Sequence, residues 1–302
     1  MTGLKHGLHS EFVPEWCAIA ALAVLDIVWT GAIGARFTVG PSDFLLLGLA
    51  VAMMGALRVF QIRKGGLMAE YFALTLAGST AICVLSYLCF ASAGPLVDER
   101  LMAMDRAIGF DWLAGYQLVS SWPALKSTLS FAYHSLIFQG LYFCLLLGLM
   151  GRKDRLRDMF WLFLLSGLFA CAGSLLIPAQ GPSKLFDIET HTGFMPVMEQ
   201  ILRGENLSFA LSDMKGIVTF PSFHTAMALG YVWAFRGTGP IGWGIAGLNL
   251  VMLAAIPFIG GHYLMDMIGG AAAMLLSVGI VKGVPALWKK PTPIPQPVTA
   301  NA

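Results

Sequence analysis

Two histidines and an aspartate are the residues of this sequence best suited to catalysis. His262 and Asp266 are four residues apart, so on a helix they share one face, one turn from each other. The carboxylate can then accept a hydrogen bond from one imidazole nitrogen, which leaves the lone pair of the other nitrogen free to attack an electrophile. The spacing therefore predicts a histidine nucleophile that an aspartate orients.

His224 lies in a second polar segment, residues 219–226. It follows Pro221 and Ser222, two residue types that favour the start of a helix. Because the first N–H groups of a helix are free and its dipole is positive there, such a start suits an anion. A second histidine beside an anion site fits the general acid of a phosphoryl transfer.

Each of these polar residues also has a purely structural interpretation. The His262–Asp266 pair could hold two helices together, and His224 alone could be a solvated helix cap. The two polar segments together favour the catalytic interpretation. We expect His134 to hydrogen-bond between helices, with the lining of a substrate cavity as the alternative. We expect Asp26 to pair with a neighbouring helix or with water.

The two polar segments resemble signature motifs of a known family. Residues 221–226 (PSFHTA) and 260–270 (GGHYLMDMIGG) are similar to the second and third motifs of the type 2 phosphatidic acid phosphatase superfamily, which contains membrane lipid phosphatases and phosphotransferases. The resemblance implies an all-α, polytopic membrane fold with a phosphatase-like helical core. It also implies that His262 forms a phosphohistidine, that Asp266 orients His262 and that His224 protonates the leaving group, with no metal and no cofactor.

The chain departs from the common family pattern at three places. Phe223 stands where the second motif usually has glycine, and Ile256 stands where the third motif has an arginine. The first motif, a lysine followed by an Arg-Pro pair, is replaced by residues 177–182 (IPAQGP). These features, with residues 104–112 (MDRAIGFDW) and 132–139 (AYHSLIFQ), are more similar to the inositol phosphorylceramide synthase branch.

Other residues must therefore balance the charge of a bound phosphate. Lys184 is the first candidate because it follows the Gly-Pro turn at residues 181–182. Weaker cationic candidates in the neighbouring segments are Arg203, Lys215 and Arg106. Further candidates for phosphate contacts are Ser222, Gly181 and Gly261.

The composition predicts the kind of elements that hold these residues. Charged residues make up 12% of the 302 residues and hydrophobic residues 57%, whereas soluble domains carry about 25% charged residues. So few charges exclude an ordinary soluble domain, a disordered chain and a coiled coil. The net charge of +2 is too small for a nucleic-acid-binding protein. The composition is typical of a polytopic membrane protein.

Eight apolar stretches approach the length of about 20 residues that a membrane-spanning helix needs. They are residues 16–35, 44–59, 68–91, 129–150, 159–178, 221–235, 241–259 and 262–281. If the N-terminus is cytoplasmic, twelve of the 19 basic residues fall on the inner side: Lys5, Arg58, Arg63, Lys64, Arg152, Lys153, Arg155, Arg157, Arg236, Lys282, Lys289 and Lys290. Both termini are then cytoplasmic, and all three polar segments lie on the outer face of the membrane.

We expect three regions along the chain. Residues 1–93 form an N-terminal three-helix membrane region, residues 94–282 a catalytic membrane domain, and residues 283–302 a disordered cytoplasmic tail. Residues 94–127 are predicted to form one or two interfacial helices, and the charged residues between positions 98 and 111 are predicted to be solvated.

The leading functional hypothesis is a membrane lipid phosphate phosphatase whose substrate, in the outer leaflet, is a phospholipid or a prenyl or sphingolipid phosphate. The alternative is a phosphotransferase of the inositol phosphorylceramide synthase type, because both reactions share the phosphohistidine step. Two other classes remain open. Two histidines and an aspartate can bind iron or zinc, and eight spans with polar groups are compatible with a transporter. The polar residues gather at one membrane face and no internal repeat is visible, which weighs against transport.

Overall fold

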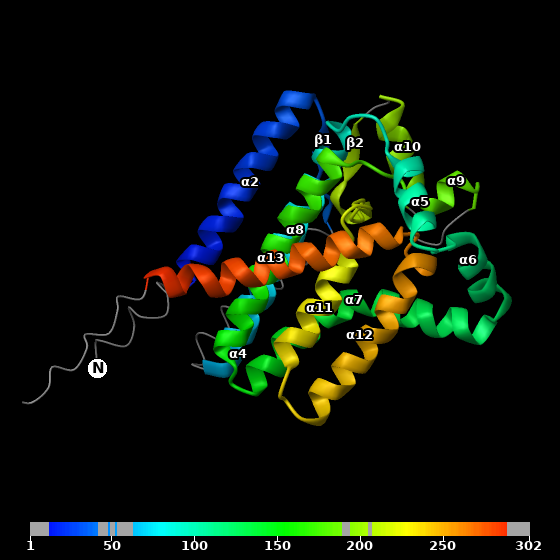
Figure 1. Ribbon diagram of the computed structural model, residues 1–302. Helices are drawn as coiled ribbons and strands as arrows, with labels where there is room; N and C mark the ends of the chain where they lie inside the picture. Colours follow the sequence, from blue (N-terminus) through cyan, green and yellow to red (C-terminus); the bar gives the residue numbers. More distant parts are fainter. Residues whose placement is uncertain are drawn as a thin grey trace, which may run out of the picture.

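The computed structural model describes residues 12–41, 48, 52, 63–188, 194–204 and 207–288. Within these ranges the regular secondary structure is helical apart from a pair of short parallel strands, which confirms the all-α prediction (Figure 1). The long helices are α2 (Val13–Ile33), α4 (Arg63–Ala91), α7 (Pro123–Leu149), α8 (Lys153–Leu176), α12 (Pro240–Ile259) and α13 (Leu264–Trp288). The shorter elements are α5 (Asp98–Ala107), α6 (Trp112–Ser121), α9 (Pro182–Leu185), α10 (Met195–Leu202), α11 (Phe223–Phe235), η1 (Leu211–Asp213), β1 (Arg36–Thr38) and β2 (Ser208–Ala210).

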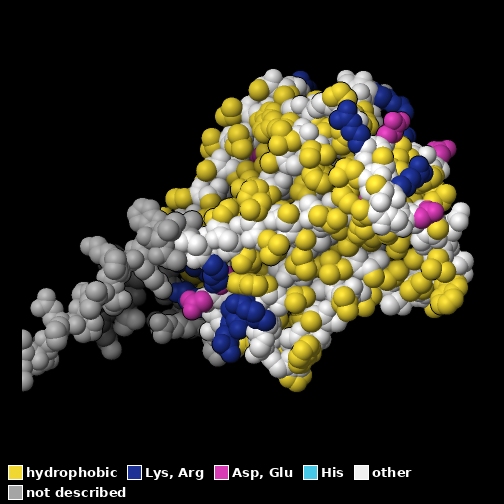
Figure 2. All heavy atoms as spheres, in the orientation of Figure 1, with side chains coloured by type: hydrophobic (Ala, Val, Ile, Leu, Met, Phe, Trp, Pro, Cys, Tyr) yellow, Lys and Arg dark blue, Asp and Glu magenta, His cyan; other side chains and the backbone are white. Residues whose placement is uncertain are grey.

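Six helices of the described part are long and apolar enough to cross a membrane: α2, α4, α7, α8, α12 and α13. The protein is an integral membrane protein, and Figure 2 shows hydrophobic side chains over most of the visible face, with Lys and Arg near its ends. Six of the eight expected spans correspond to these helices. The expected span at 44–59 lies almost wholly outside the described residues.

The expected span at 221–235 corresponds to α11, which has only 13 residues. A helix of that length is about 20 Å long, shorter than the hydrocarbon core of about 30 Å. Residues 214–222 approach α11 without regular structure. Because α11 is short, its first turn does not reach the end of α7. His224 in this turn therefore contacts Tyr133, which lies inside α7 and not at its end.

Helix α8 lies at the centre of the bundle, because it packs against α4, α7, α11 and α13. Leu156, Met159 and Phe160 of α8 are completely buried. Near the other end of α8, Gly173 lets the loop before α11 approach closely, since a Cβ atom there would lie 2.1 Å from Cδ of Pro221. Small residues of this kind permit tight packing between elements in a membrane, where van der Waals contact is a main driving force.

Polar side chains inside the bundle are paired differently from our expectation. The hydrogen bond between α7 and α12 is made by Gln139 and Asn249, whose Nδ2 donates to Oε1 of Gln139 over 2.8 Å. The interhelical role predicted for His134 is wrong: this side chain is exposed, and its Nδ1 lies 2.8 Å from the carbonyl oxygen of Ser130 in the same helix. Asp26 is buried, and its Oδ1 has no hydrogen-bond partner among the described residues.

A basic cluster joins three helices at the end of the bundle away from the start of α11. Nη1 of Arg155 donates to the carbonyl oxygens of Ala234 and Arg236 over 2.9 and 2.7 Å. Lys282 of α13 forms an ion pair with Asp158 of α8. The cluster thus places positively charged side chains at these ends of α8, α11 and α13.

The Gly173 contact generates a prediction about stability. Replacing Gly173 with valine should force α8 and the loop at Pro221 apart, because the new side chain overlaps a rigid proline ring. Overpacking of this kind costs about 1–3 kcal/mol. We expect a lower midpoint of thermal unfolding in detergent, measured by intrinsic fluorescence.

The neighbouring substitution Ala172→Val is the matched control, because it places the same side chain in the same helix at an exposed position. Equal midpoints for the two variants would contradict the tight contact between Gly173 and Pro221.

Candidate active site

Three segments far apart in the sequence meet at one end of the bundle. The amide N–H of Ser222 donates to the carbonyl oxygen of Asp266 over 2.8 Å, which joins the start of α11 to the start of α13. A Cβ atom on Gly181 would lie 2.4 Å from the carbonyl oxygen of Gly261, so the loop before α9 touches the loop before α13. The structure therefore brings together segments 177–182, 219–226 and 260–270, as the sequence predicts.

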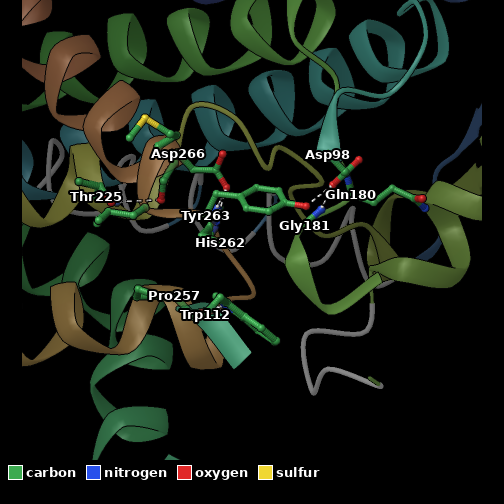
Figure 3. A network of polar contacts seen from close by, with 12 residues as sticks. Asp98, Trp112, Gln180, Gly181, Thr225, Pro257, His262, Tyr263 and Asp266 are labelled. Carbon is green, nitrogen blue, oxygen red and sulfur yellow. Dashed lines mark hydrogen bonds and ion pairs between the residues drawn. The ribbon is translucent and has the colours of Figure 1, made fainter. Parts of the chain in front are cut away.

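His262 and Asp266 lie in contact at the start of α13. Nδ1 of His262 lies 3.2 Å from Oδ2 of Asp266, and the two side chains are 6% and 0% exposed. The same Oδ2 accepts the amide N–H of Tyr263 over 2.8 Å, which fixes the carboxylate (Figure 3). With Asp266 ionised, Nδ1 of His262 carries the proton and Nε2 carries the free lone pair.

His224 faces the same space from the first turn of α11. Its ring centroid lies 6.4 Å from that of His262, close enough for both rings to contact one phosphoryl group. The His224 ring stacks on Tyr133 of α7, with centroids 4.2 Å apart and planes 9° from parallel. Ser222 caps α11, since its Oγ accepts the amide N–H of Thr225 over 3.3 Å.

Gly260 allows Tyr133 of α7 to pack closely beside His262. A Cβ atom at this position would lie 2.6 Å from Cε2 of Tyr133 and 3.0 Å from Cδ2 of His262. Tyr133 therefore contacts both histidine-bearing segments, and it was not among the residues that the sequence pointed to. Its place beside His134 in an apolar stretch carries no signal that separates it from a packing residue.

Two carboxylates of α5 support the site, and the prediction that both are solvated is wrong. Asp98 is 6% exposed and Asp105 is 0% exposed. Oδ1 of Asp98 accepts the amide N–H of Gly181 over 2.8 Å, and the Asp105 carboxylate accepts the amide N–H groups of Leu264 and Met265 over 2.8 and 3.0 Å. The other charged residues of this segment, Glu99, Arg100, Arg106 and Asp111, are exposed as expected.

A sequence signal for the two buried carboxylates does exist. Asp98 and Asp105 are seven residues apart, which is two helical turns and hence one face of a helix. Burial raises the pKa of the Asp105 carboxyl, while the two N–H groups that it accepts act in the opposite direction. Burial and then the Asp98 carboxylate raise the pKa of the Tyr263 phenol, so its hydroxyl is a donor and gives a 2.9 Å hydrogen bond to Oδ1 of Asp98.

Cations do not surround the histidines as the common family motifs would require. Lys184 forms an ion pair with Glu199 of α10, which holds the pKa of that carboxyl below its usual value. Arg203 lies 3.6 Å from the same carboxylate, and Ile256 is fully buried among apolar side chains. Within the described ranges, no ion pair or hydrogen bond joins a lysine or arginine to His262, Asp266 or His224.

The remaining candidates for phosphate contact divide into two groups. Ser222, Gly181 and Gly261 lie in the segments that meet at the histidines. Lys215 is exposed in the stretch before α11, and Arg106 is exposed near the end of α5. The described residues contain no group of three histidine, cysteine, aspartate or glutamate side chains placed to hold a metal ion.

The close approach at Gly181 predicts the effect of a single methyl group. Gly181 has φ +104°, and the Cβ atom of Gly181→Ala would overlap the carbonyl oxygen of Gly261. We expect the free energy of unfolding in detergent, measured by denaturant titration, to fall by about 1–3 kcal/mol beyond the backbone strain alone.

Gly109→Ala is the control for the backbone strain, because Gly109 has φ +81° and a Cβ atom there would meet no other atom within 4 Å. The same loss of stability in both variants would show that the two loops do not touch at Gly181.

Comparison with known proteins gives one match. Residues 99–280 match the family described as the PAP2 superfamily. The match covers 182 of the 302 residues, from α5 to α13, and includes all three segments of the site. No curated protein and no solved structure matches the chain.

Proposed function

The chain belongs to the PAP2 superfamily of phosphoesterases, and on this basis we propose that it hydrolyses the phosphoester of a membrane lipid phosphate through a phosphohistidine intermediate. The observation that carries the proposal is the arrangement of the three side chains. Asp266 holds Nδ1 of one buried histidine, and a second histidine faces that ring across 6.4 Å. This is the geometry of a nucleophile and a general acid on two sides of one reacting group.

The first chemical step follows from these positions. Nε2 of His262 attacks phosphorus, and the bond between phosphorus and the lipid oxygen breaks. Burial, and then the neighbouring His262, lower the pKa of the His224 ring to about 3, so His224 acts as the acid only when the negative charge of a bound phosphoryl group raises that pKa. In that complex the protonated His224 gives its proton to the leaving oxygen, and the lipid departs as an alcohol. Asp266 stabilises the positive charge that develops on the His262 ring.

The second step releases the phosphate. His224, now neutral, takes a proton from water as the water oxygen attacks phosphorus. The P–N bond breaks, its electron pair returns to Nε2 of His262, and inorganic phosphate leaves. Both steps use protein side chains and water, and we propose that neither a metal nor a cofactor takes part.

Backbone groups are the proposed phosphate ligands. The first N–H groups of α11, those of Phe223 and His224, have no acceptor within the helix. The Ser222 hydroxyl accepts from Thr225, so its own hydrogen can be donated. Gly261 adds an N–H group from the loop before α13, whereas the N–H of Gly181 is already donated to Asp98, so Gly181 contributes by its close approach to Gly261. Lys184 would contribute only if its ammonium group left Glu199 and formed an ion pair with the phosphate instead.

The charge distribution supports an orientation in the membrane. The basic cluster of Arg155, Arg236 and Lys282 lies at the end of the bundle away from the histidines. Since short cytoplasmic loops are enriched in Lys and Arg, we propose that the cluster faces the cytoplasm together with both termini. The histidines then face the outer side of the membrane and take their lipid from the outer leaflet.

The proposal predicts a trapped phosphohistidine. The purified protein in detergent should release phosphate from a lipid phosphate such as phosphatidate, and a radiolabelled, acid-labile phosphoenzyme should form at His262. General acid–base catalysis contributes about 10²- to 10⁴-fold, so His224→Ala should lower kcat by that factor. With an aryl phosphate, whose leaving group needs no proton, the same variant should still form the phosphoenzyme but hydrolyse it slowly.

His262→Ala should abolish both the label and the turnover. His134→Ala is the matched control, because it removes an exposed imidazole from the adjacent helix α7. Phosphate release by His262→Ala at the wild-type rate would refute the mechanism.

A second candidate function is favoured by the lack of cations. A phosphomonoester carries close to two negative charges at neutral pH, since its second pKa is about 6, whereas a phosphodiester carries one. Ile256 is buried where the common family motif has arginine, and no lysine or arginine is paired with the three catalytic candidates within the described residues. A site with little positive charge suits a phosphodiester, because an unpaired buried charge is costly. This supports transfer of a phospho-headgroup to an alcohol, as the inositol phosphorylceramide synthase branch performs.

Matched substrates separate the two functions. A transferase should consume phosphatidylinositol faster than phosphatidate and form a new phosphodiester only when ceramide, or a diacylglycerol with different acyl chains, is added, which mass spectrometry of the lipid products detects. A phosphatase should release inorganic phosphate from phosphatidate at a rate that added alcohol does not increase. Turnover of phosphatidate alone would reject the transferase.

A further inference from the structure

We infer that helix α5 positions the nucleophile of the proposed reaction, with Asp105 and Asp98 as the positioning residues. The inference rests on the proposed function in that it assigns His262 as the nucleophile. Within the described part of the chain, no side chain of α5 hydrogen-bonds to His262 itself. The helix acts instead on the two loops that frame this histidine, one through each carboxylate.

Asp105 completes the start of α13. Its Oδ2 accepts the amide N–H of Leu264 over 2.8 Å, and its Oδ1 accepts that of Met265 over 3.0 Å. The first N–H groups of a helix find no acceptor inside it, and the residue before a helix usually supplies a capping oxygen. Here Tyr263 precedes α13 and offers no such oxygen, so a buried carboxylate 159 residues earlier in the chain supplies it.

Asp98 holds the loop that faces the nucleophile. Its Oδ1 accepts the amide N–H groups of Gln180 and Gly181 over 3.0 and 2.8 Å. The same oxygen accepts the hydroxyl of Tyr263 over 2.9 Å. In Figure 3 the ring of Tyr263 reaches from the side of His262 towards Asp98 and Gly181. Tyr263 is the residue next to His262, so it links the nucleophile's loop to the opposite loop through Asp98.

The two carboxylates act as one unit because they are two turns apart on the same face of α5. Hydrogen bonds made by residues directly before and shortly after α5 hold this helix in place. The amide N–H of Val97 donates to the carbonyl oxygen of Pro178 over 2.9 Å. After α5, Nε1 of the buried Trp112 donates to the carbonyl oxygen of Pro257 over 2.7 Å. Helix α5 therefore determines the separation of the 180–181 loop and the 260–265 segment.

In this arrangement the rate of the chemical step depends on α5, which is not one of the six helices long enough to span a membrane. If Asp105 no longer accepts the two N–H groups, the first turn of α13 is free to shift, and Asp266 in that turn shifts with it. A displacement of about 1 Å at reacting groups lowers rates by about 100-fold. Substrate binding depends less on this turn, because the proposed phosphate ligands also include the start of α11.

The test compares three variants of the full-length protein in detergent. Asp105→Asn replaces one accepting oxygen with an NH₂ group that faces an N–H donor, and Tyr263→Phe removes only the hydroxyl that binds Asp98. Glu99→Gln makes the same acid-to-amide change at an exposed position of the same helix. We expect kcat to fall by about 10- to 100-fold in the first two variants, with KM within about 3-fold of wild type, and no change in Glu99→Gln.

Hydrogen exchange tests the same inference without turnover. The amides of Leu264 and Met265, followed by mass spectrometry of peptides covering residues 262–267, should exchange at least about tenfold faster in Asp105→Asn than in Glu99→Gln. If the wild type turns over no lipid phosphate, the proposed function fails, and this measurement still decides whether Asp105 holds the turn.

Three results would overturn the inference. One is a kcat of both Asp105→Asn and Tyr263→Phe within twofold of the Glu99→Gln value. Another is a rise in KM as large as the fall in kcat, which would indicate a binding or general structural role. The third is unchanged exchange at residues 264 and 265. If Asp105→Asn does not fold, Tyr263→Phe keeps the kinetic test decisive, because it removes a single hydroxyl.

Discussion

The hydrogen bonds at the start of α13 are the interaction that holds the site together. In apolar surroundings an N–H group without an acceptor costs about 1–3 kcal/mol, so these groups must be satisfied by side chains. Asp266 accepts from Tyr263, and Asp105 accepts from the next two residues. Because Asp266 also holds His262, the cap of the helix and the orientation of the histidine are one hydrogen-bond network.

Close backbone approaches allow three distant segments to share this network. Gly173, Gly181 and Gly260 each stand where a Cβ atom would come within 2.6 Å of a neighbouring atom. These glycines let the proline before α11 pack on α8, the carbonyl of Gly261 touch the loop before α9, and the ring of Tyr133 touch the loop before α13. The site thus arises from the ends of α8, α11, α12 and α13, with α5 bound across them. The spanning helices supply the scaffold, and the loops between them supply the contacts.

Electrostatics distinguish this site from the common pattern of its family. Lys184, the cation that directly follows the Gly-Pro turn at residues 181–182, is already paired with Glu199. Acidic side chains hold the loops, and we propose that N–H groups and imidazoles bind the anion. We expect a site of this composition to discriminate between substrates by their charge, which is why the monoester and the diester lead to different proposed reactions.

Features that depend on local periodicity could be predicted from the amino-acid sequence. The spacing of His262 and Asp266 predicted their contact, and long apolar stretches predicted six helices that the structure contains. The burial of Asp98 and Asp105 depends on tertiary packing, as does the choice of Gln139 over His134 for the bond to α12. Helical spacing shows which residues share a face. Which groups that face contacts, here N–H groups 159 and 160 residues from Asp105, depends on how the helices pack.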